Sequence, residues 1–194
     1  MNKLKREDLW SLEEYAEKRP AYRTEVLAHK KNRQVPLGDN ARLYFEDATT
    51  IRYQIQEMLR VERVFEAAGI QEELDAYNPL ISDGHNWKAT FMLEYADPSE
   101  RASRLAELRG IEDRVWVQVE GGEKVYAIAD EDLERENEQK TSAVHFLRFE
   151  FSPQDIARLK DGTPFKIGVD HPNYLVGGFT PEHNICESLI EDLT

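Results

Sequence analysis

The sequence predicts an α+β fold in which a mainly antiparallel sheet of about five or six strands packs with several helices. Three features of the chain support this prediction. Two long stretches with a helical period lie before most of the stretches that alternate with a period of two. Most of the alternating stretches follow one another after a hairpin-length connection or a single helix, which favours antiparallel neighbours. A parallel βαβ arrangement is the alternative fold.

The first 35 residues are predicted to be largely helical. Asp8 can cap a short helix that Arg19 and Pro20 end, so residues 1–19 are expected to form an N-terminal helical arm. Pro20 also suits the first position of a second helix, which continues until Pro36 stops it.

The stretch Thr49–Gly69 is predicted to form one long helix, of about residues 49–68, at the centre of the fold. Its apolar residues recur at steps of three and four, the spacing that buries one face of a helix, and Glu62 falls in the same row. An unpaired buried charge costs several kcal/mol. Glu62 therefore needs a cation, a metal or a proton, or the helix must turn this carboxylate to solvent. The apolar members of the row are Ile51, Ile55, Met58, Phe65 and Gly69.

The other elements follow from their period and their end signals. Residues 86–95 alternate regularly and make the clearest strand, and Gly121-Gly122 suits the tight turn of a hairpin. Asp97-Pro98 is a start signal for a helix. We expect further strands at residues 41–46, 114–119, 124–129, 142–151 and 164–171, and further helices at residues 71–80, 97–108, 153–160 and 181–190.

The composition limits the class of protein. A chain of 194 residues with 40% apolar residues fits a single domain, which we expect to span residues 1–194. The formal charge of −13 argues against nucleic acid as a partner, because phosphates attract Lys and Arg. No stretch is apolar for long enough to act as a signal peptide or to cross a membrane. The single cysteine, Cys186, excludes an intrachain disulfide and fits the cytoplasm, where we expect the protein.

Residues 1–33 form a basic region in this acidic chain, because they carry nine Lys or Arg against six Asp or Glu. In one interpretation these cations are solvated helix positions that pair with acidic groups elsewhere. In the other they form a surface for an anion or an acidic partner, whose binding would depend on salt. The residues of this candidate surface are Arg19, Arg23, Lys30, Lys31 and Arg33.

Ionisable side chains on two predicted strands are candidates for chemistry. His145 shares a strand face with apolar residues, Arg148 lies on the opposite face, and His171 comes where the last predicted strand ends. Imidazole and carboxylate groups suit zinc, iron or manganese, and they also suit general-base catalysis. The alternative is that the histidines are packed hydrogen-bonding residues. The candidate catalytic residues are Glu57, Glu62, His145 and Arg148, and the candidate metal ligands are Glu46, Glu57, Glu62, His145 and His171.

Two observations narrow these candidates. Glu57 and Glu62 are five residues apart, which places them about 140° from one another around a helix, so we do not expect one ion to bind both. The sequence contains no Glu-x-x-His pair for a di-iron site and none of the common nucleotide, zinc-protease or serine-hydrolase motifs. No cofactor is therefore implied by motif.

The chain resembles the bacterial domain-of-unknown-function family 3501 in the blocks HKKNRQVPLG, FEDATTIRYQIQEMLRVERVFE, IQEELDAYNPLISDG, KATFMLEY, KTSAVHFLRFEF and VDHPNY. The resemblance runs to about Tyr174 and implies one cytoplasmic domain. Residues 175–194 lie outside these blocks and are expected to form a C-terminal helical tail. Genes of this family often lie beside those of rubrerythrin-like and iron–sulfur oxidoreductase proteins, which implies such proteins as partners. The resemblance carries over no catalytic residue.

The leading hypothesis is an accessory or interaction protein, associated with redox or peroxide-stress systems, in which polar groups of the long helix and of the His145 strand form a buried network. The alternative is a small metal-dependent or acid–base enzyme that uses the carboxylates of the long helix with His145. The alternative requires these groups to converge.

Overall fold

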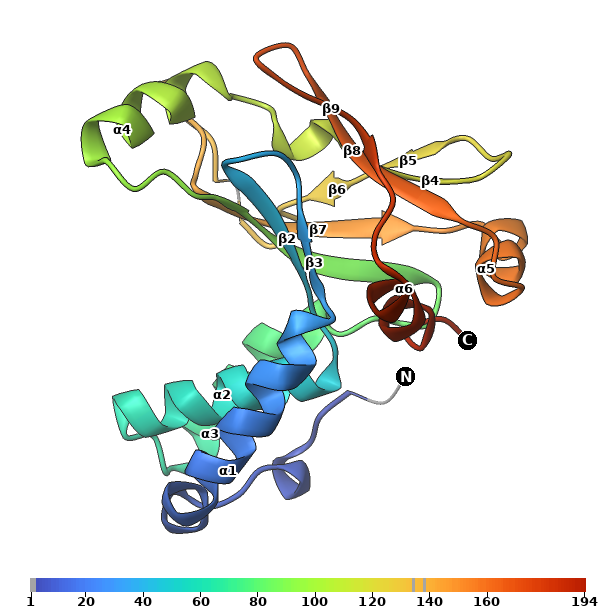
Figure 1. Ribbon diagram of the computed structural model, residues 1–194. Helices are drawn as coiled ribbons and strands as arrows, with labels where there is room; N and C mark the ends of the chain where they lie inside the picture. The colour runs from blue at the N-terminus through green and yellow to red at the C-terminus, as the bar shows by residue number, and fades with distance from the viewer. Residues whose placement is uncertain (1–2, 134, 138) are drawn as a thin grey trace.

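The computed structural model describes residues 3–133, 135–137 and 139–194, and it confirms the α+β fold (Figure 1). Its helices are α1 (Leu12–Lys31), α2 (Ala48–Glu62), α3 (Ala67–Tyr77), α4 (Pro98–Glu107), α5 (Pro153–Lys160) and α6 (His183–Ile190), with short 3-10 turns η1 (Arg6–Asp8), η2 (Asn78–Leu80) and η3 (Glu112–Arg114). Its strands are β1 (Gln34–Pro36), β2 (Ala41–Phe45), β3 (Asn86–Leu93), β4 (Val115–Val119), β5 (Lys124–Tyr126), β6 (Ile128–Ala129), β7 (Val144–Glu150), β8 (Phe165–His171) and β9 (Tyr174–Phe179).

These strands form two sheets where the sequence predicts one. The first has the order β1-β2-β3-β7-β6 and the second the order β5-β4-β8-β9, and the neighbours pair antiparallel in both. The predicted strand 124–129 is divided between them, because β5 completes the hairpin with β4 whereas β6 pairs with β7 of the other sheet. The backbone N–H of Ala127, between β5 and β6, still donates to the carbonyl of Val115 at 2.9 Å.

The N-terminal arm does not end at Pro20. Helix α1 runs through this proline, and Ser11 starts it with a capping box in which the Ser11 hydroxyl accepts from the backbone N–H of Glu14. A proline inside a helix removes one backbone hydrogen bond without necessarily ending the helix. The arm and the second predicted helix are therefore one element of 20 residues.

The long central helix is shorter than predicted. Helix α2 ends at Glu62 because Arg63 adopts a left-handed backbone conformation with φ of 55°, and α3 begins only at Ala67. In the predicted apolar row Ile51 and Ile55 are buried and Met58 is half-buried, whereas the side chain of Phe65 is 73% exposed. Glu62 is exposed at the end of α2, so this carboxylate needs no buried partner.

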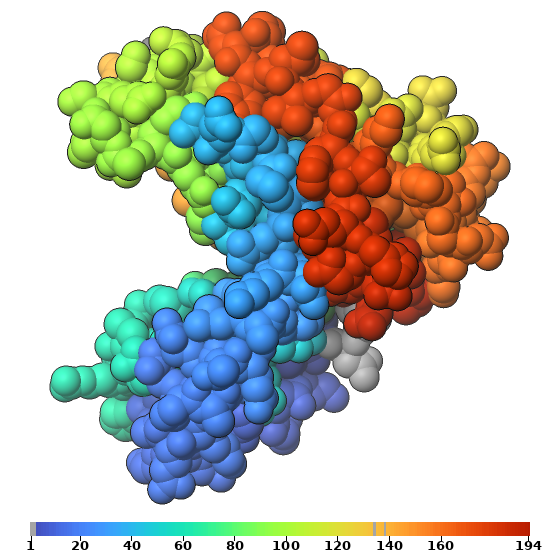
Figure 2. All heavy atoms as spheres, viewed as in Figure 1, coloured from blue at the N-terminus to red at the C-terminus, as the bar shows by residue number. Residues whose placement is uncertain are grey.

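The described residues form two apolar cores. Helices α2 and α3 contribute most of the smaller core, and the second core fills the space between the two sheets. Figure 1 shows α1, α2 and α3 gathered on one side of the molecule and the two sheets on the other. The space-filling view is hollowed between the helical part and the part that carries α4 (Figure 2). Within the described residues, no helix combines the length and the apolar character needed to cross a membrane.

The expected C-terminal tail is helical only in its second half. Its first residues form β9, which pairs with β8, and α6 follows. Ile185 and Leu189 of α6 are buried in the core between the sheets, and the Leu189 carbonyl accepts a hydrogen bond of 2.8 Å from the indole N–H of Trp87. The segment thus contributes to the core of the fold.

Candidate functional site

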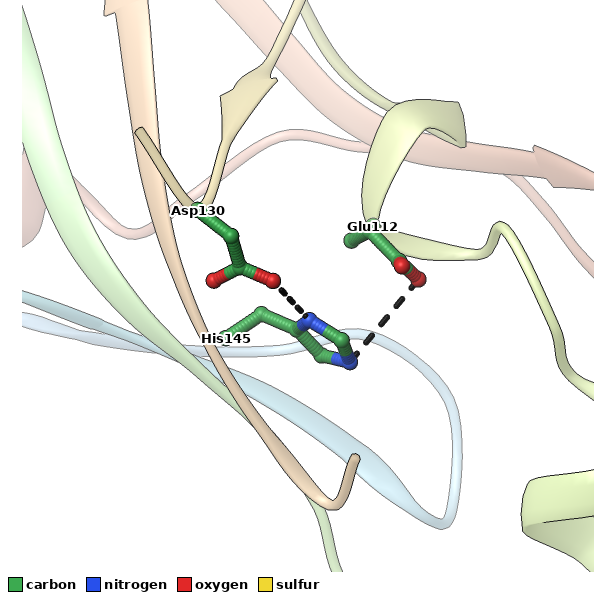
Figure 3. Close-up of side chains that lie close together, drawn as sticks. All are labelled: Glu112, Asp130 and His145. Atoms are coloured by element: carbon green, nitrogen blue, oxygen red, sulfur yellow. Dashed lines mark hydrogen bonds and ion pairs between the residues drawn. The ribbon is translucent and has the colours of Figure 1, made fainter. Parts of the chain in front are cut away.

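His145 lies at the centre of a buried polar cluster (Figure 3). Its Nδ1 is 2.6 Å from the carboxylate of Asp130, and its Nε2 is 3.8 Å from the carboxylate of Glu112. The hydroxyl of Thr141 lies 2.9 Å from Nε2 and 3.2 Å from the Glu112 carboxylate, so it contacts both groups. The Ser142 carbonyl oxygen is 3.1 Å from the same Nε2. The imidazole is therefore surrounded by oxygen atoms on both sides.

Elements of both sheets bring these groups together. His145 is the second residue of β7, Asp130 directly follows β6 of the same sheet, and Glu112 opens the 3-10 turn that leads into β4 of the other sheet. The backbone N–H of Phe146 donates to the Asp130 carboxylate at 2.9 Å and so fixes the Asp130 side chain. The backbone of Asp130 has a positive φ of 48°. Burial raises the pKa of Glu112, because removal from water disfavours the ionised carboxylate.

A pocket of about 450 Å³ adjoins this cluster. Thr141 and Ser142 form part of its wall, and Arg135 lines it as well. The guanidinium of Arg135 is 3.2 Å from the Asp130 carboxylate. Among the described residues, Glu112, Asp130 and His145 are the one group of three His, Cys, Asp or Glu side chains whose ligand atoms all lie within 4.8 Å of one another.

The carboxylates of α2 do not converge on this cluster. Glu57 binds Arg19 through two contacts of 2.6 and 2.9 Å and accepts a hydrogen bond of 2.7 Å from the hydroxyl of Tyr15. The hydrogen bonds from Arg19 lower the pKa of Glu57 to about 2, because they favour the ionised form. Glu57 is thus a weak base held in an ion pair between two helices. Glu62 is exposed at the C-terminal end of α2.

Glu46 and His171, the other predicted metal ligands, also have separate partners. The Glu46 carboxylate accepts hydrogen bonds from the hydroxyls of Thr50 at 2.6 Å and Thr90 at 2.8 Å. Nε2 of His171 lies 3.0 Å from the carbonyl of Arg109, while its Nδ1 accepts from a backbone N–H at 3.2 Å. One donor and one acceptor satisfy a neutral imidazole, so His171 matches the packed interpretation.

The candidate basic surface is divided by burial. Arg19 is bound to Glu57, and Arg33 is only 2% exposed. The ammonium of Lys30 lies 5.5 Å from the ring centroid of Tyr53. Arg23 and Lys31 are exposed on α1. The five cations therefore do not form one continuous surface.

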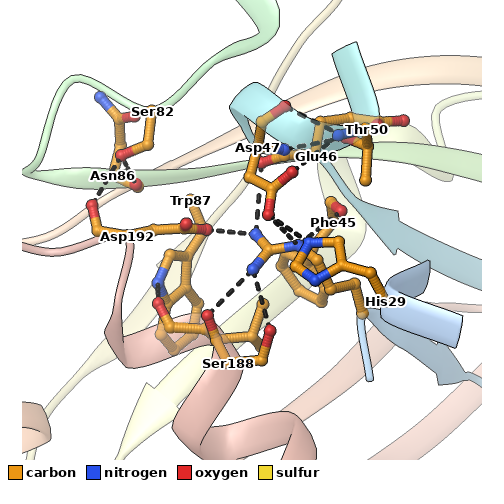
Figure 4. Close-up of polar contacts among 12 residues, drawn as sticks. His29, Phe45, Glu46, Asp47, Thr50, Ser82, Asn86, Trp87, Ser188 and Asp192 are labelled. Carbon is orange, nitrogen blue, oxygen red and sulfur yellow. Dashed lines mark hydrogen bonds and ion pairs between the residues drawn. The ribbon is translucent and has the colours of Figure 1, made fainter. Parts of the chain in front are cut away.

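Arg33 joins segments that are distant in the sequence. Figure 4 labels four of its partners, Phe45, Asp47, Ser188 and Asp192. The Arg33 guanidinium donates to the carbonyls of Phe45 at 3.1 Å and Ser188 at 2.9 Å, and it contacts the carboxylates of Asp47, at 3.5 Å, and Asp192. Because Ser188 and Asp192 belong to the C-terminal segment, this buried cation fastens that segment to the start of α2.

Arg148 lines a different cleft, of about 640 Å³. Its guanidinium makes two hydrogen bonds of 2.8 Å to the Glu131 carboxylate and one of 2.5 Å to that of Glu150. Residues of α3, η2 and β7 form the walls of this cleft. Arg148 and His145 lie on opposite faces of β7, as the alternation predicts, so they do not act on one ligand.

The sequence makes His145 a candidate but does not indicate its contacts with Glu112, Asp130 and Thr141. Glu112 and Asp130 occur in polar stretches that have no period, and an acidic loop is a common surface feature. The separation of 15 residues between Asp130 and His145 becomes a contact only because β6 pairs with β7.

A protein-family model and a solved structure both match nearly the full length of the chain. The family model "Protein of unknown function (DUF3501)" matches residues 3–193, which includes most of the segment beyond Tyr174. A crystal structure of a novel protein of unknown function from Burkholderia pseudomallei K96243 is 51% identical in sequence, with a TM-score of 0.95 over 100% of both chains. No curated protein matches the chain. The chain belongs to the DUF3501 family of proteins of unknown function.

Proposed function

We propose that this protein is an interaction protein that binds an apolar segment of a partner protein in the cleft between α3 and β7. The observation that carries the proposal is the cleft of about 640 Å³, a volume within the range of about 300–1,000 Å³ typical of binding sites. Tyr77, Leu80 and Phe146 line it and are each only half-buried, so a ligand could still cover them.

The charged groups of the cleft already have partners. Arg148 is paired with Glu131 and Glu150, and the ammonium of Lys88 is 2.9 Å from the Asp83 carboxylate and 2.7 Å from the Pro79 carbonyl. Because paired charges offer little further gain to an incoming charge, burial of the aromatic and aliphatic surface is the main source of affinity. This favours an apolar segment as the ligand.

The partner class follows from the family resemblance. Rubrerythrin-like and iron–sulfur oxidoreductase proteins are the first partners to test, in an accessory role in redox or peroxide-stress systems. A cytoplasmic location is part of the proposal, and the single Cys186 is consistent with a reducing compartment.

The test measures binding by calorimetry between the full chain and a purified rubrerythrin-like or iron–sulfur oxidoreductase protein from the same organism. Phe146→Ser should weaken binding at least tenfold, because truncation of an aromatic anchor often costs about 2 kcal/mol or more. Leu175→Ser is the matched control, since Leu175 is 75% exposed and lies on β9 of the other sheet.

Titration with an anilinonaphthalene sulfonate dye tests the cleft without a partner. The dye should bind the wild type and Leu175→Ser equally and Phe146→Ser at least tenfold more weakly. Equal binding by all three proteins, of partner and dye alike, would show that the cleft is not the interaction site.

A further inference from the structure

Both ring nitrogens of His145 face oxygen atoms. Nδ1 faces the Asp130 carboxylate at 2.6 Å, and Nε2 faces the Thr141 hydroxyl at 2.9 Å and the Ser142 carbonyl at 3.1 Å. When the Nδ1–H of a neutral imidazole donates to Asp130, Nε2 offers a lone pair toward the Thr141 hydroxyl and the Ser142 carbonyl. His171 differs, because one of its nitrogens faces a backbone N–H.

We propose that the Nε2 side of His145 is a binding site for one divalent transition-metal ion. The ligands are Nε2 of His145, the Glu112 carboxylate, the Thr141 hydroxyl and the Ser142 carbonyl. This site is separate from the cleft of the proposed function and does not depend on it.

The distances between these atoms suit a shared ion. Nε2 lies 2.9 Å from the Thr141 hydroxyl, 3.1 Å from the Ser142 carbonyl and 3.8 Å from the Glu112 carboxylate. Metal–ligand bonds of about 2.0–2.2 Å place neighbouring ligand atoms roughly 3–3.5 Å apart. The Thr141 hydroxyl and the Glu112 carboxylate are 3.2 Å apart, whereas the Glu112 contact to Nε2 has to shorten.

Asp130 has the role of a positioning residue. Histidine ligands commonly donate their second ring N–H to a carboxylate, which fixes the tautomer and the orientation of the ring. Asp130 provides that carboxylate at Nδ1, and its own second oxygen is held by the backbone N–H of Phe146. The imidazole is therefore oriented with Nε2 toward the three oxygen ligands.

The local charge also favours a cation. Two carboxylates, Glu112 and Asp130, lie beside one imidazole, and among the described residues the guanidinium of Arg135 is the cation paired with them, at Asp130. The buried Glu112 carboxylate is not paired with a Lys or Arg among the described residues, so no such cation offsets its charge. A metal ion would supply that charge.

The donor set indicates the class of ion. One imidazole nitrogen and three oxygens, without a thiolate, suit Zn²⁺, Mn²⁺ or Fe²⁺ better than copper(I). The pocket of about 450 Å³ meets the proposed site at two of its ligand residues, Thr141 and Ser142, which form part of its wall. Because Glu112 leads into β4 and His145 belongs to β7, a bound ion would link the two sheets.

The experiment titrates Zn²⁺ into the full-length, tag-free protein after its metals have been removed with a chelator and the chelator has been removed in turn. Calorimetry should show one ion per chain with a Kd in the micromolar range or below, and the thermal unfolding temperature should rise. Glu112→Gln should weaken binding at least tenfold while keeping the shape of the side chain. Asp130→Asn should weaken it about 10–100-fold, as is usual for a residue that orients a ligand.

The control is the double variant His183→Ala/Glu187→Gln. His183 and Glu187 form an exposed pair at 3.3 Å on α6 and are an alternative surface site for zinc. Unchanged affinity in this control, together with a zinc anomalous-scattering peak beside Nε2 of His145 in a crystal, would support the proposal. Absence of saturable Zn²⁺ binding, or binding that Glu112→Gln leaves intact, would overturn the proposal.

Discussion

Arg33→Met tests whether one buried cation holds the C-terminal segment in place. Methionine fills a similar volume but donates no hydrogen bond, so the carboxylates of Asp47 and Asp192 and the carbonyls of Phe45 and Ser188 lose a partner that now contacts all four. Removal of one member of a buried ion pair costs about 3–5 kcal/mol, because the other charge stays buried without compensation. We expect a loss in this range at pH 7.

Urea denaturation followed by circular dichroism gives the free energy of unfolding of each variant. Arg23→Met is the matched control on α1, where the side chain is exposed, and its effect should stay within about 0.5 kcal/mol. The double variant Arg33→Met/Asp192→Leu should recover much of the loss, since an apolar replacement of a whole buried pair is often neutral. A loss below about 1 kcal/mol for Arg33→Met alone would refute the reasoning.

Three further predictions concern stability. Burial raises the pKa of Asp192 from 3.8 to about 6, so the folded state binds this proton more tightly than the unfolded state does. The free energy of unfolding should therefore fall by about 3 kcal/mol as the pH rises through this window. Asp192→Asn should abolish that fall in denaturation curves measured from pH 4 to 7. The pKa of Glu57 is lowered from 4.5 to about 2, so the stability that its ionised carboxylate contributes is present above pH 4.5 and is lost as the pH falls. Glu57→Gln should flatten the acid side of the plot of unfolding temperature against pH, and an unchanged slope there would contradict this. Gly168→Ala should destabilise by about 1–3 kcal/mol in urea, because the added Cβ would lie 2.3 Å from the Trp116 ring, whereas Gly177→Ala, with open space around it, should cost less than Gly168→Ala.

The sequence predicts elements well where local chemistry marks both ends. The strand expected at residues 86–95 matches β3, and Asp97 caps α4 through the backbone N–H of Glu100 as its spacing predicts. The predicted helix 49–68 fails at Arg63, because a left-handed residue normally signals itself as glycine or asparagine and here it is an arginine. The apolar spacing continues across the break, since α3 begins soon afterwards with its own apolar face.

The candidate site shows why ionisable groups are harder to place than elements. An ionisable residue on an apolar strand face is visible in the sequence, and this pattern makes His145 a candidate. Its partners are set by the pairing of β6 with β7 and by the packing of the two sheets, which no local period encodes.

The burial of Arg33 is likewise set by residues that are distant in the sequence. Arg33 belongs to the basic region of residues 1–33, and its neighbours Lys30 and Lys31 are the last residues of α1. Arg33 itself is only 2% exposed. The difference arises from Asp192, which is 159 residues away in the sequence and reaches the guanidinium only after α6 has docked. A cation becomes structural when a distant carboxylate and carbonyls replace its water, and local charge density carries no information about that exchange. The number of acceptors that surround a buried cation or imidazole in the folded chain is therefore the better guide to what it does, for Arg33 as for His145.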